Sequence, residues 1–117
     1  MLQAVGAGYE GPLRTPRRAL AERFSFWRGA SGQRYVCSVY PPASVPPYAP
    51  SVALHVRRGP FGPAVLAVTA GSDPLPASDE VHLHLVRGDA EALALAIQDL
   101  AALVAPLRPV IVTRRAA

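Results

Sequence analysis

The sequence predicts an α+β fold: a mainly antiparallel sheet of five or six strands, with one C-terminal helix packed on one face. Two pairs of short runs, rich in aromatic and β-branched residues, are each joined by a glycine-containing turn, which is typical of a β-hairpin. A fifth run, residues 80–87, alternates apolar and other side chains as a half-buried strand does. Residues 89–105 then carry apolar residues at helical spacing, and a helix with one apolar face needs a sheet to cover it.

Length and composition predict one globular domain. The chain has 117 residues, of which 50% are hydrophobic and 17% are charged. A chain of this size buries enough surface for a core without disulfides or metals. Residues 1–14 contain glycine and proline without periodicity and are predicted to be a flexible N-terminal arm, so the domain spans residues 15–117.

The first hairpin is predicted from residues 24–28 and 34–40, joined by a five-residue connection that contains two glycines. It holds the only Trp and the only Cys of the chain. Ahead of it, Thr15 and Pro16 form a helix-start signal, which predicts a short helix over residues 16–22.

A proline-rich segment separates the two hairpins. Residues 41–50 contain five prolines, which cannot pair inside a sheet and favour an extended, stiff crossover. The second hairpin follows from residues 51–58 and 63–70, closed by a turn over residues 59–62.

The fifth strand alternates Val81, Leu83 and Leu85 with two histidines, and we expect the apolar set to lie under the helix. Asp89 is placed as the N-cap of that helix. Its apolar stripe consists of Leu93, Ala96, Ile97, Leu100, Leu103 and Val104, with Leu95 as an exception among the polar side chains. A last short edge strand is predicted over residues 109–113.

The charge permits nucleic-acid binding without strongly favouring it. The net charge is +4, and all twelve basic residues are Arg. Abundant Ala, Arg, Gly and Pro are typical of proteins encoded by GC-rich genomes, so part of this charge carries no information about a partner. A basic balance still allows contact with nucleic acid or acidic surfaces.

We expect a cytoplasmic protein of bacterial type without a membrane partner. No apolar run approaches the roughly 18 to 20 residues that span a bilayer. The first residues lack the charged start and apolar segment of a signal peptide. Cys37 is the only cysteine, so we expect a small buried side chain, with no intrachain disulfide and no cysteine-rich zinc site.

The histidines offer one metal-binding alternative. His82 and His84 stand two residues apart on one strand, and His55 lies on another; alternation predicts that all three point away from the helix-covered face. Imidazoles at this spacing can chelate a metal ion if the strands are neighbours. Half-exposed polar residues on an outer sheet face are the other interpretation.

Catalytic motifs are absent from the sequence. There is no phosphate loop, dinucleotide fingerprint or paired carboxylate motif, and Ser31 lies in a hairpin turn and not at a strand-to-helix elbow. We therefore expect no enzymatic activity and no cofactor.

The leading functional hypothesis is an interaction module that binds a protein partner or self-associates through the open sheet face, because exposed apolar faces usually mark interfaces. The second alternative is single-stranded nucleic acid bound by the arginines and aromatic residues at the hairpin ends. The predicted binding face comprises Trp27, Arg28, Arg34, Tyr40, His55, Arg57, His82 and His84.

The first hairpin also carries a resemblance. Its Trp-Arg-Gly-Ala-Ser-Gly-x-Arg-Tyr segment, residues 27–35, together with residues 80–85, is similar to a hairpin in a group of small uncharacterised bacterial proteins. The resemblance implies no activity, cofactor or site.

Overall fold

Six strands form one antiparallel sheet in the order β1-β2-β3-β6-β4-β5. The structure is a computed structural model that describes residues 7–47, 50–71 and 78–104. The strands are β1 Gly8–Pro12, β2 Phe24–Arg28, β3 Arg34–Tyr40, β4 Ser51–Gly59, β5 Gly62–Ala70 and β6 Glu80–Leu85. The helical elements are α1 Arg18–Ala21, η1 Pro42–Ser44, α2 Ala90–Leu100 and η2 Ala101–Leu103. The predicted α+β architecture is confirmed.

Both predicted hairpins form. β2 pairs with β3 from Phe24 opposite Ser38 to Arg28 opposite Arg34, and β4 pairs with β5 over nearly its full length. The turns depend on glycines in the left-handed region, Gly32 with φ 89° and Gly62 with φ 110°.

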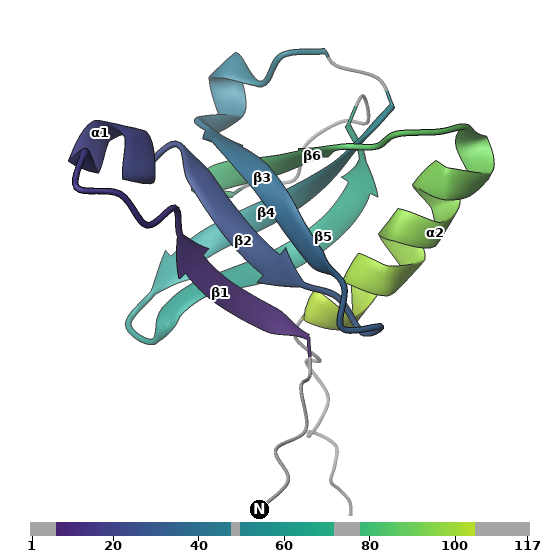
Figure 1. Ribbon diagram of the computed structural model, residues 1–117, viewed down its shortest axis with the longest axis horizontal. Helices are drawn as coiled ribbons and strands as arrows, with labels where there is room; N and C mark the ends of the chain where they lie inside the picture. Colours follow the sequence, from purple (N-terminus) through teal and green to yellow (C-terminus); the bar gives the residue numbers. More distant parts are fainter. Residues whose placement is uncertain (1–6, 48–49, 72–77, 105–117) are drawn as a thin grey trace, which may run out of the picture.

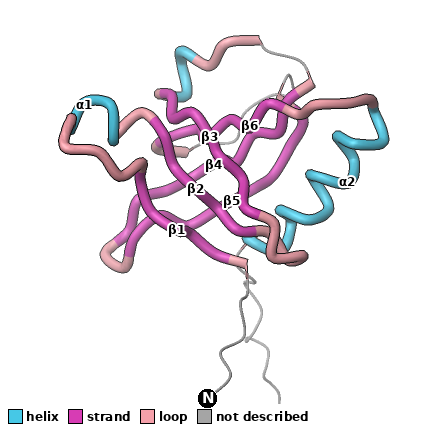
Figure 2. The backbone as a smooth tube through the Cα atoms, viewed as in Figure 1, coloured by secondary structure: helices cyan, strands magenta, loops and turns pink. Residues whose placement is uncertain are grey.

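β6 lies between the two hairpins and joins them into one sheet, because it pairs with β3 on one side and with β4 on the other. The sheet curls strongly, so that the β1–β3 part faces the β4–β5 part across the core (Figure 1). In Figure 2 the strands follow one another around this curl, and α2 lies along its side. We call the inner surface the concave face and the outer surface the convex face.

The N-terminal region differs from the prediction. Gly8–Pro12 is a strand that pairs with β2, so this part of the expected flexible arm belongs to the sheet. Residues 1–6 lie outside the described residues. The predicted helix over 16–22 is reduced to α1, which has four residues and no side-chain cap, because a two-turn helix without a buried face is marginal.

α2 packs its apolar stripe on the concave face, as predicted. Asp89 caps its N-terminus by accepting hydrogen bonds from the backbone of Glu91 and Ala92. The helix contacts β4 and β5, and Val104 beyond it forms a parallel bridge with Val65. Two stripe residues are buried in the main core cluster, Ala96 and Leu100, and the partly buried ones pack against it: Leu93, Ile97, Leu103 and Val104. The edge strand predicted over residues 109–113 lies outside the described residues.

The two faces of β6 are the reverse of the prediction. Residues opposite each other in an antiparallel pair share a face, and His82 lies opposite Leu54, which packs in the core with α2. The histidines of β6 therefore point to the concave face. Val81 and Leu83 point to the convex face, where Val45 of the proline-rich crossover packs against their cluster.

Candidate functional site

A wedge opens in the sheet where β3 and β6 diverge. The two strands pair only from Ser38 opposite Leu83 to Tyr40 opposite Val81. Beyond this point β3 continues back to Arg34 beside β2 alone, while β6 continues to Leu85 beside β4 alone. α2 closes the concave side of the gap. We call this space the β3–β6 wedge.

Backbone groups of both strands face into the wedge. In an antiparallel sheet the amide and carbonyl groups of alternate residues point to the same neighbour. The Val39 amide donates toward β2, to the carbonyl of Arg23, and the Val86 amide donates toward the β4 side, to the carbonyl of Pro50. By alternation, the backbone groups of Val36 and Leu85 point toward each other's strand across the wedge.

His84 bridges the wedge with its side chain. Its Nδ1 lies 2.9 Å from the carbonyl oxygen of Val36. Because a carbonyl can only accept, Nδ1 carries the proton and donates. The imidazole also meets the ring of Tyr35 edge to face, with centroids 5.0 Å apart. Its Nε2 has no hydrogen-bond partner among the described residues.

Asp99 of α2 fixes the other end of the wedge. Its carboxylate accepts hydrogen bonds from the Ser31 amide at 2.7 Å, the Ser31 hydroxyl at 2.8 Å and the Tyr35 hydroxyl at 2.7 Å. Burial works to raise the pKa of Asp99, but these hydrogen bonds outweigh it and lower the pKa. The pKa of Tyr35 is raised by burial and by its bond to Asp99. The carboxylate therefore stays charged and the phenol stays neutral.

The first hairpin loop is shaped to receive this carboxylate. A Cβ on Gly29 would lie only 2.3 Å from Oδ2 of Asp99, so only glycine allows the close approach. The backbone amide of Ala30 also donates to the carbonyl of Asp99 at 3.1 Å. The loop and the last turn of α2 are thus held together.

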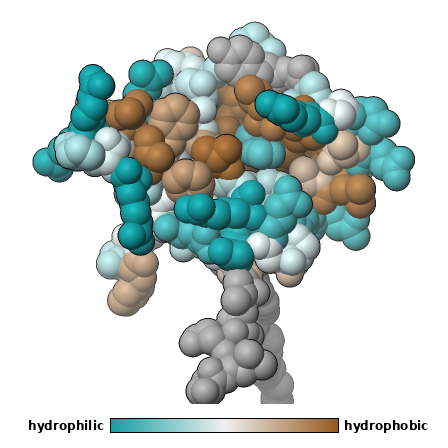
Figure 3. Space-filling model, viewed as in Figure 1, coloured by the Kyte–Doolittle hydropathy of each residue, from teal (hydrophilic) through white to brown (hydrophobic). Residues whose placement is uncertain are grey.

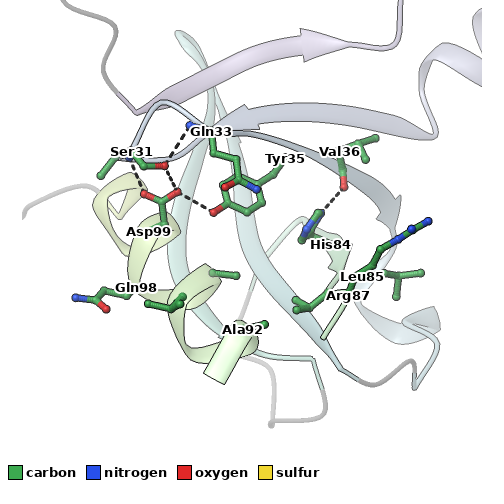
Figure 4. Close-up of a pocket in the computed structure, with 14 residues that line it drawn as sticks. Ser31, Gln33, Tyr35, Val36, His84, Leu85, Arg87, Ala92, Gln98 and Asp99 are labelled. Carbon is green, nitrogen blue, oxygen red and sulfur yellow. Dashed lines mark hydrogen bonds between the residues drawn. The ribbon is translucent and has the colours of Figure 1, made fainter. Parts of the chain in front are cut away.

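Apolar side chains line and surround the wedge. The cavity measures about 910 Å³, and its lining includes Val36, Leu85 and Leu95, which are 49%, 56% and 59% exposed. Figure 3 shows apolar surface on the side of the molecule that carries α2. In Figure 4, Tyr35 and His84 lie between the Asp99 cluster and the end of β6. The cavity thus joins an apolar rim to a small set of fixed polar groups.

A second polar cluster runs from the buried Trp27 and His82 to the exposed Arg58. The indole Nε1 of Trp27 donates to Nδ1 of His82 at 2.9 Å, and Nε2 of His82 lies 2.7 Å from Oε1 of Glu80. Oε2 of Glu80 in turn receives Arg58 at 2.9 Å. Since indole nitrogen only donates, Nδ1 of His82 must be unprotonated, and the ring is neutral with its proton on Nε2.

The directions of the pKa shifts agree with a neutral His82 ring. Burial lowers the pKa of His82, although Glu80 works in the opposite direction. Burial also works to raise the pKa of Glu80, but the hydrogen bonds from Arg58 and His82 outweigh it and lower that pKa. Both ring nitrogens of His82 are occupied, so the histidine has no free atom with which to move a proton for a substrate.

The eight residues of the predicted binding face are divided between the two faces of the sheet. Those on the concave side are Trp27, His82 and His84, and those on the convex side are Arg28, Arg34, Tyr40, His55 and Arg57. Trp27 and His82 are buried in the core. The expectation that the sheet is open on the side of the histidines is therefore wrong, because this side of β6 faces the core.

The arginines predicted to contact nucleic acid are partly neutralised. Glu10 of β1 forms ion pairs with both Arg28 and Arg34, and its pKa is lowered, mainly by the hydrogen bond from Arg28. The guanidinium of Arg34 also lies 4.2 Å from the centre of the Phe26 ring. Trp27 of this hairpin is buried on the opposite face and does not join Arg28 and Arg34. Nucleic-acid binding by the remaining residues stays a prediction.

The three histidines do not converge. His55 is buried on the convex side, where Nε2 contacts the hydroxyl of Thr69 at 2.8 Å, and burial lowers its pKa. His82 and His84 lie on the opposite face, so the predicted three-histidine metal site is wrong. Within residues 7–47, 50–71 and 78–104, no group of three or more His, Cys, Asp or Glu could hold a metal ion.

Sequence reasoning missed the main contributors to the wedge. Asp99 lies 64 residues from Tyr35 and 68 from Ser31, and no local pattern connects them. One signal was present: Leu95 interrupts the polar side of the helix, and it is one of the exposed apolar residues at the wedge.

Comparisons with protein-family models, curated proteins and solved structures give no match for this chain. Of the helices within the described residues, none has the length and apolar character needed to cross a membrane.

Proposed function

We propose that this chain is a non-catalytic binding module that docks an apolar segment of a partner protein in the β3–β6 wedge. The observation that carries the proposal is the clustering of exposed apolar residues. Five large hydrophobic side chains are exposed among the described residues, and three of them, Val36, Leu85 and Leu95, line this one cavity. Exposed apolar groups gathered at one concavity usually mark an interface.

The size and lining of the cavity support binding. Ligand sites commonly measure about 300–1,000 Å³ and combine apolar walls with a few fixed polar groups. The wedge, at about 910 Å³, lies within this range. Its polar residues are already held in place, since Asp99 fixes Ser31 and Tyr35.

The protonation states of the polar groups favour binding over catalysis. A general acid or base works best with a pKa near the operating pH. Here the pKa of Tyr35 is raised and that of Asp99 is lowered, away from neutrality in both cases. The hydroxyl of Ser31 donates to Asp99 and accepts from the Gln33 amide, so it is engaged in holding the loop.

A cytoplasmic location stays a prediction.

Selection from a phage-displayed peptide library on the immobilised chain tests the proposal. We expect enriched peptides whose affinity for Leu95→Glu falls at least about tenfold, because a charge at the rim opposes burial of apolar side chains. Phe61→Glu is the matched control, since Phe61 is fully exposed in the β4–β5 turn and does not line the wedge. Failure to enrich any peptide, or equal losses in the two variants, would contradict the proposal.

A further inference from the structure

Resting on the proposed function, we propose that the docked segment is an extended peptide strand that pairs with the free edge of β3 and carries an acidic side chain opposite Arg87. The free edge is the wedge-facing side of residues 34–37, the part of β3 that has no partner in β6. These four residues span about 13 Å at the usual strand rise. That length suits a short strand and gives the pairing a defined register.

The strand is favoured because backbone groups face the wedge. Val36 directs its amide and carbonyl toward the missing neighbour, as the alternation of β3 requires. An extended peptide supplies amides and carbonyls in the same alternation, which is how segments add to exposed sheet edges. A helix satisfies its own backbone internally and would leave the edge of β3 unpaired.

His84 already occupies one position of the missing strand. Its Nδ1–H donates to the Val36 carbonyl at 2.9 Å, which is the bond that a backbone amide of a neighbouring strand would make. A docked peptide would take over this carbonyl, and the imidazole would rotate away. The existing bond therefore marks the register of the proposed pairing.

The cavity accepts side chains on both sides of such a strand. Tyr35 and Val36 are consecutive residues and point to opposite faces, and both line the cavity; the same holds for His84 and Leu85. The wedge therefore passes through the plane of the sheet. Alternate side chains of the peptide would meet Leu95 and α2 on one side, and Val36 and Leu85 on the other.

Charge selects an acidic peptide. The two charged residues that line the wedge are Arg87 and Asp99. Asp99 already accepts three side-chain or backbone hydrogen bonds, whereas no acid of the described residues forms an ion pair with Arg87. A carboxylate on the peptide therefore gains a partner at the Arg87 end, and a cation does not.

Backbone ester substitution tests the strand. Each amide of an enriched peptide is replaced in turn by an ester, which removes one N–H donor. We expect losses of about tenfold at alternate positions, where the N–H faces β3, and smaller losses at the positions between them, where the N–H faces the Leu85 side of the wedge. Equal effects at successive positions, or no effect at any, would overturn the strand assignment while peptides that depend on Leu95 would still support the proposed function.

Charge reversal tests the acidic contact. We expect Arg87→Glu to weaken an acidic peptide about tenfold, and replacement of the peptide acid by Lys to restore most of that loss. Arg57→Glu is the control, since Arg57 is exposed on β4 and does not line the wedge. No rescue by the Lys peptide would overturn the contact. If sedimentation shows that the chain forms a dimer and that Leu95→Glu abolishes it, the proposal of a separate peptide is overturned. The occupant of the wedge would then be a second copy of the chain.

Discussion

The indole nitrogen of Trp27 donates a hydrogen bond to Nδ1 of His82 across 2.9 Å in the interior of the curled sheet. This contact joins β2 to β6, strands that do not pair directly. It continues through Glu80 to Arg58 of β4. A polar chain that starts at the buried Trp27 and His82 and ends at the exposed Arg58 therefore connects both halves of the sheet, and it requires a neutral histidine.

Stability should fall as the pH is lowered through the range in which histidine titrates. Burial lowers the pKa of both His55 and His82 in the folded chain, whereas the unfolded chain takes up these protons at about pH 6.5. Below that pH the unfolded state binds more protons, so the free energy of unfolding falls by up to about 1.4 kcal/mol per pH unit for each histidine. Urea denaturation between about pH 7.5 and 5.5 measures this slope.

Substitutions measure how much of this pH dependence of stability comes from His82. His82→Gln removes one titrating group and should reduce the slope. Val68→Ala, which weakens the core without removing a titrating group, should lower stability at every pH and keep the slope. A free energy of unfolding that is constant over this pH range would contradict the buried neutral histidines.

Trp27→Phe should destabilise the chain by more than its lost apolar contact. The substitution leaves Nδ1 of His82 buried without a donor, which costs about 1–3 kcal/mol. The same substitution in a His82→Leu background should cost at least about 1 kcal/mol less, because no acceptor remains to be orphaned. Denaturant unfolding of the four proteins gives the coupling, and strict additivity would show that the hydrogen bond contributes nothing.

Gly29→Ala should loosen the attachment of α2 to the first hairpin. The new methyl group would lie 2.3 Å from Oδ2 of Asp99, so the carboxylate must leave its position; we expect a loss of about 1–3 kcal/mol. Gly8→Ala is the control, since nothing lies within 4 Å of a Cβ there. Combination with Asp99→Ala should remove most of the penalty, as judged by thermal unfolding. Equal losses for Gly29→Ala with and without Asp99 would contradict this role.

Cys37 should be unreactive in the folded chain. It is fully buried, and burial raises the pKa of its thiol to about 12. Because the thiolate is the reactive form, alkylation near pH 8 should be at least about a thousandfold slower than for the same chain in denaturant. Mass spectrometry after timed iodoacetamide treatment measures the ratio, and comparable rates in the two states would place Cys37 at the surface.

Local signals were sufficient to predict the hairpins and the helix. Turn glycines and β-branched runs predicted β2 with β3 and β4 with β5, and Asp89 with the spacing from Leu93 to Leu100 predicted α2 and its buried stripe. These features are determined by residues that are close in sequence. Gly8–Pro12 was missed, because its glycine and proline content masks a strand whose pairing is set by β2.

The faces of β6 could not be predicted from alternation. A period of two separates the histidines from Val81 and Leu83 but does not say which set is inside. Polarity pointed the histidines outward, yet His82 is buried because Trp27, 55 residues away, supplies a donor. Leu83 in turn packs in the convex-face cluster that also holds Val45. Contacts between residues this far apart in the sequence produce no pattern in the sequence around either residue.

The wedge could not be predicted either, because it arises where two strands that are paired at one end diverge at the other. Strand lengths and patterns do not report that divergence.

The most direct test of the docking account is an NMR titration of the ¹⁵N-labelled chain with an enriched peptide. We predict that the amide shifts gather at residues 31–36, 84–87 and 92–99, and that the Val36 amide becomes protected from solvent exchange on binding. Shifts confined to β5 or to α1, with Val36 unchanged, would contradict the claim that the partner binds in the wedge.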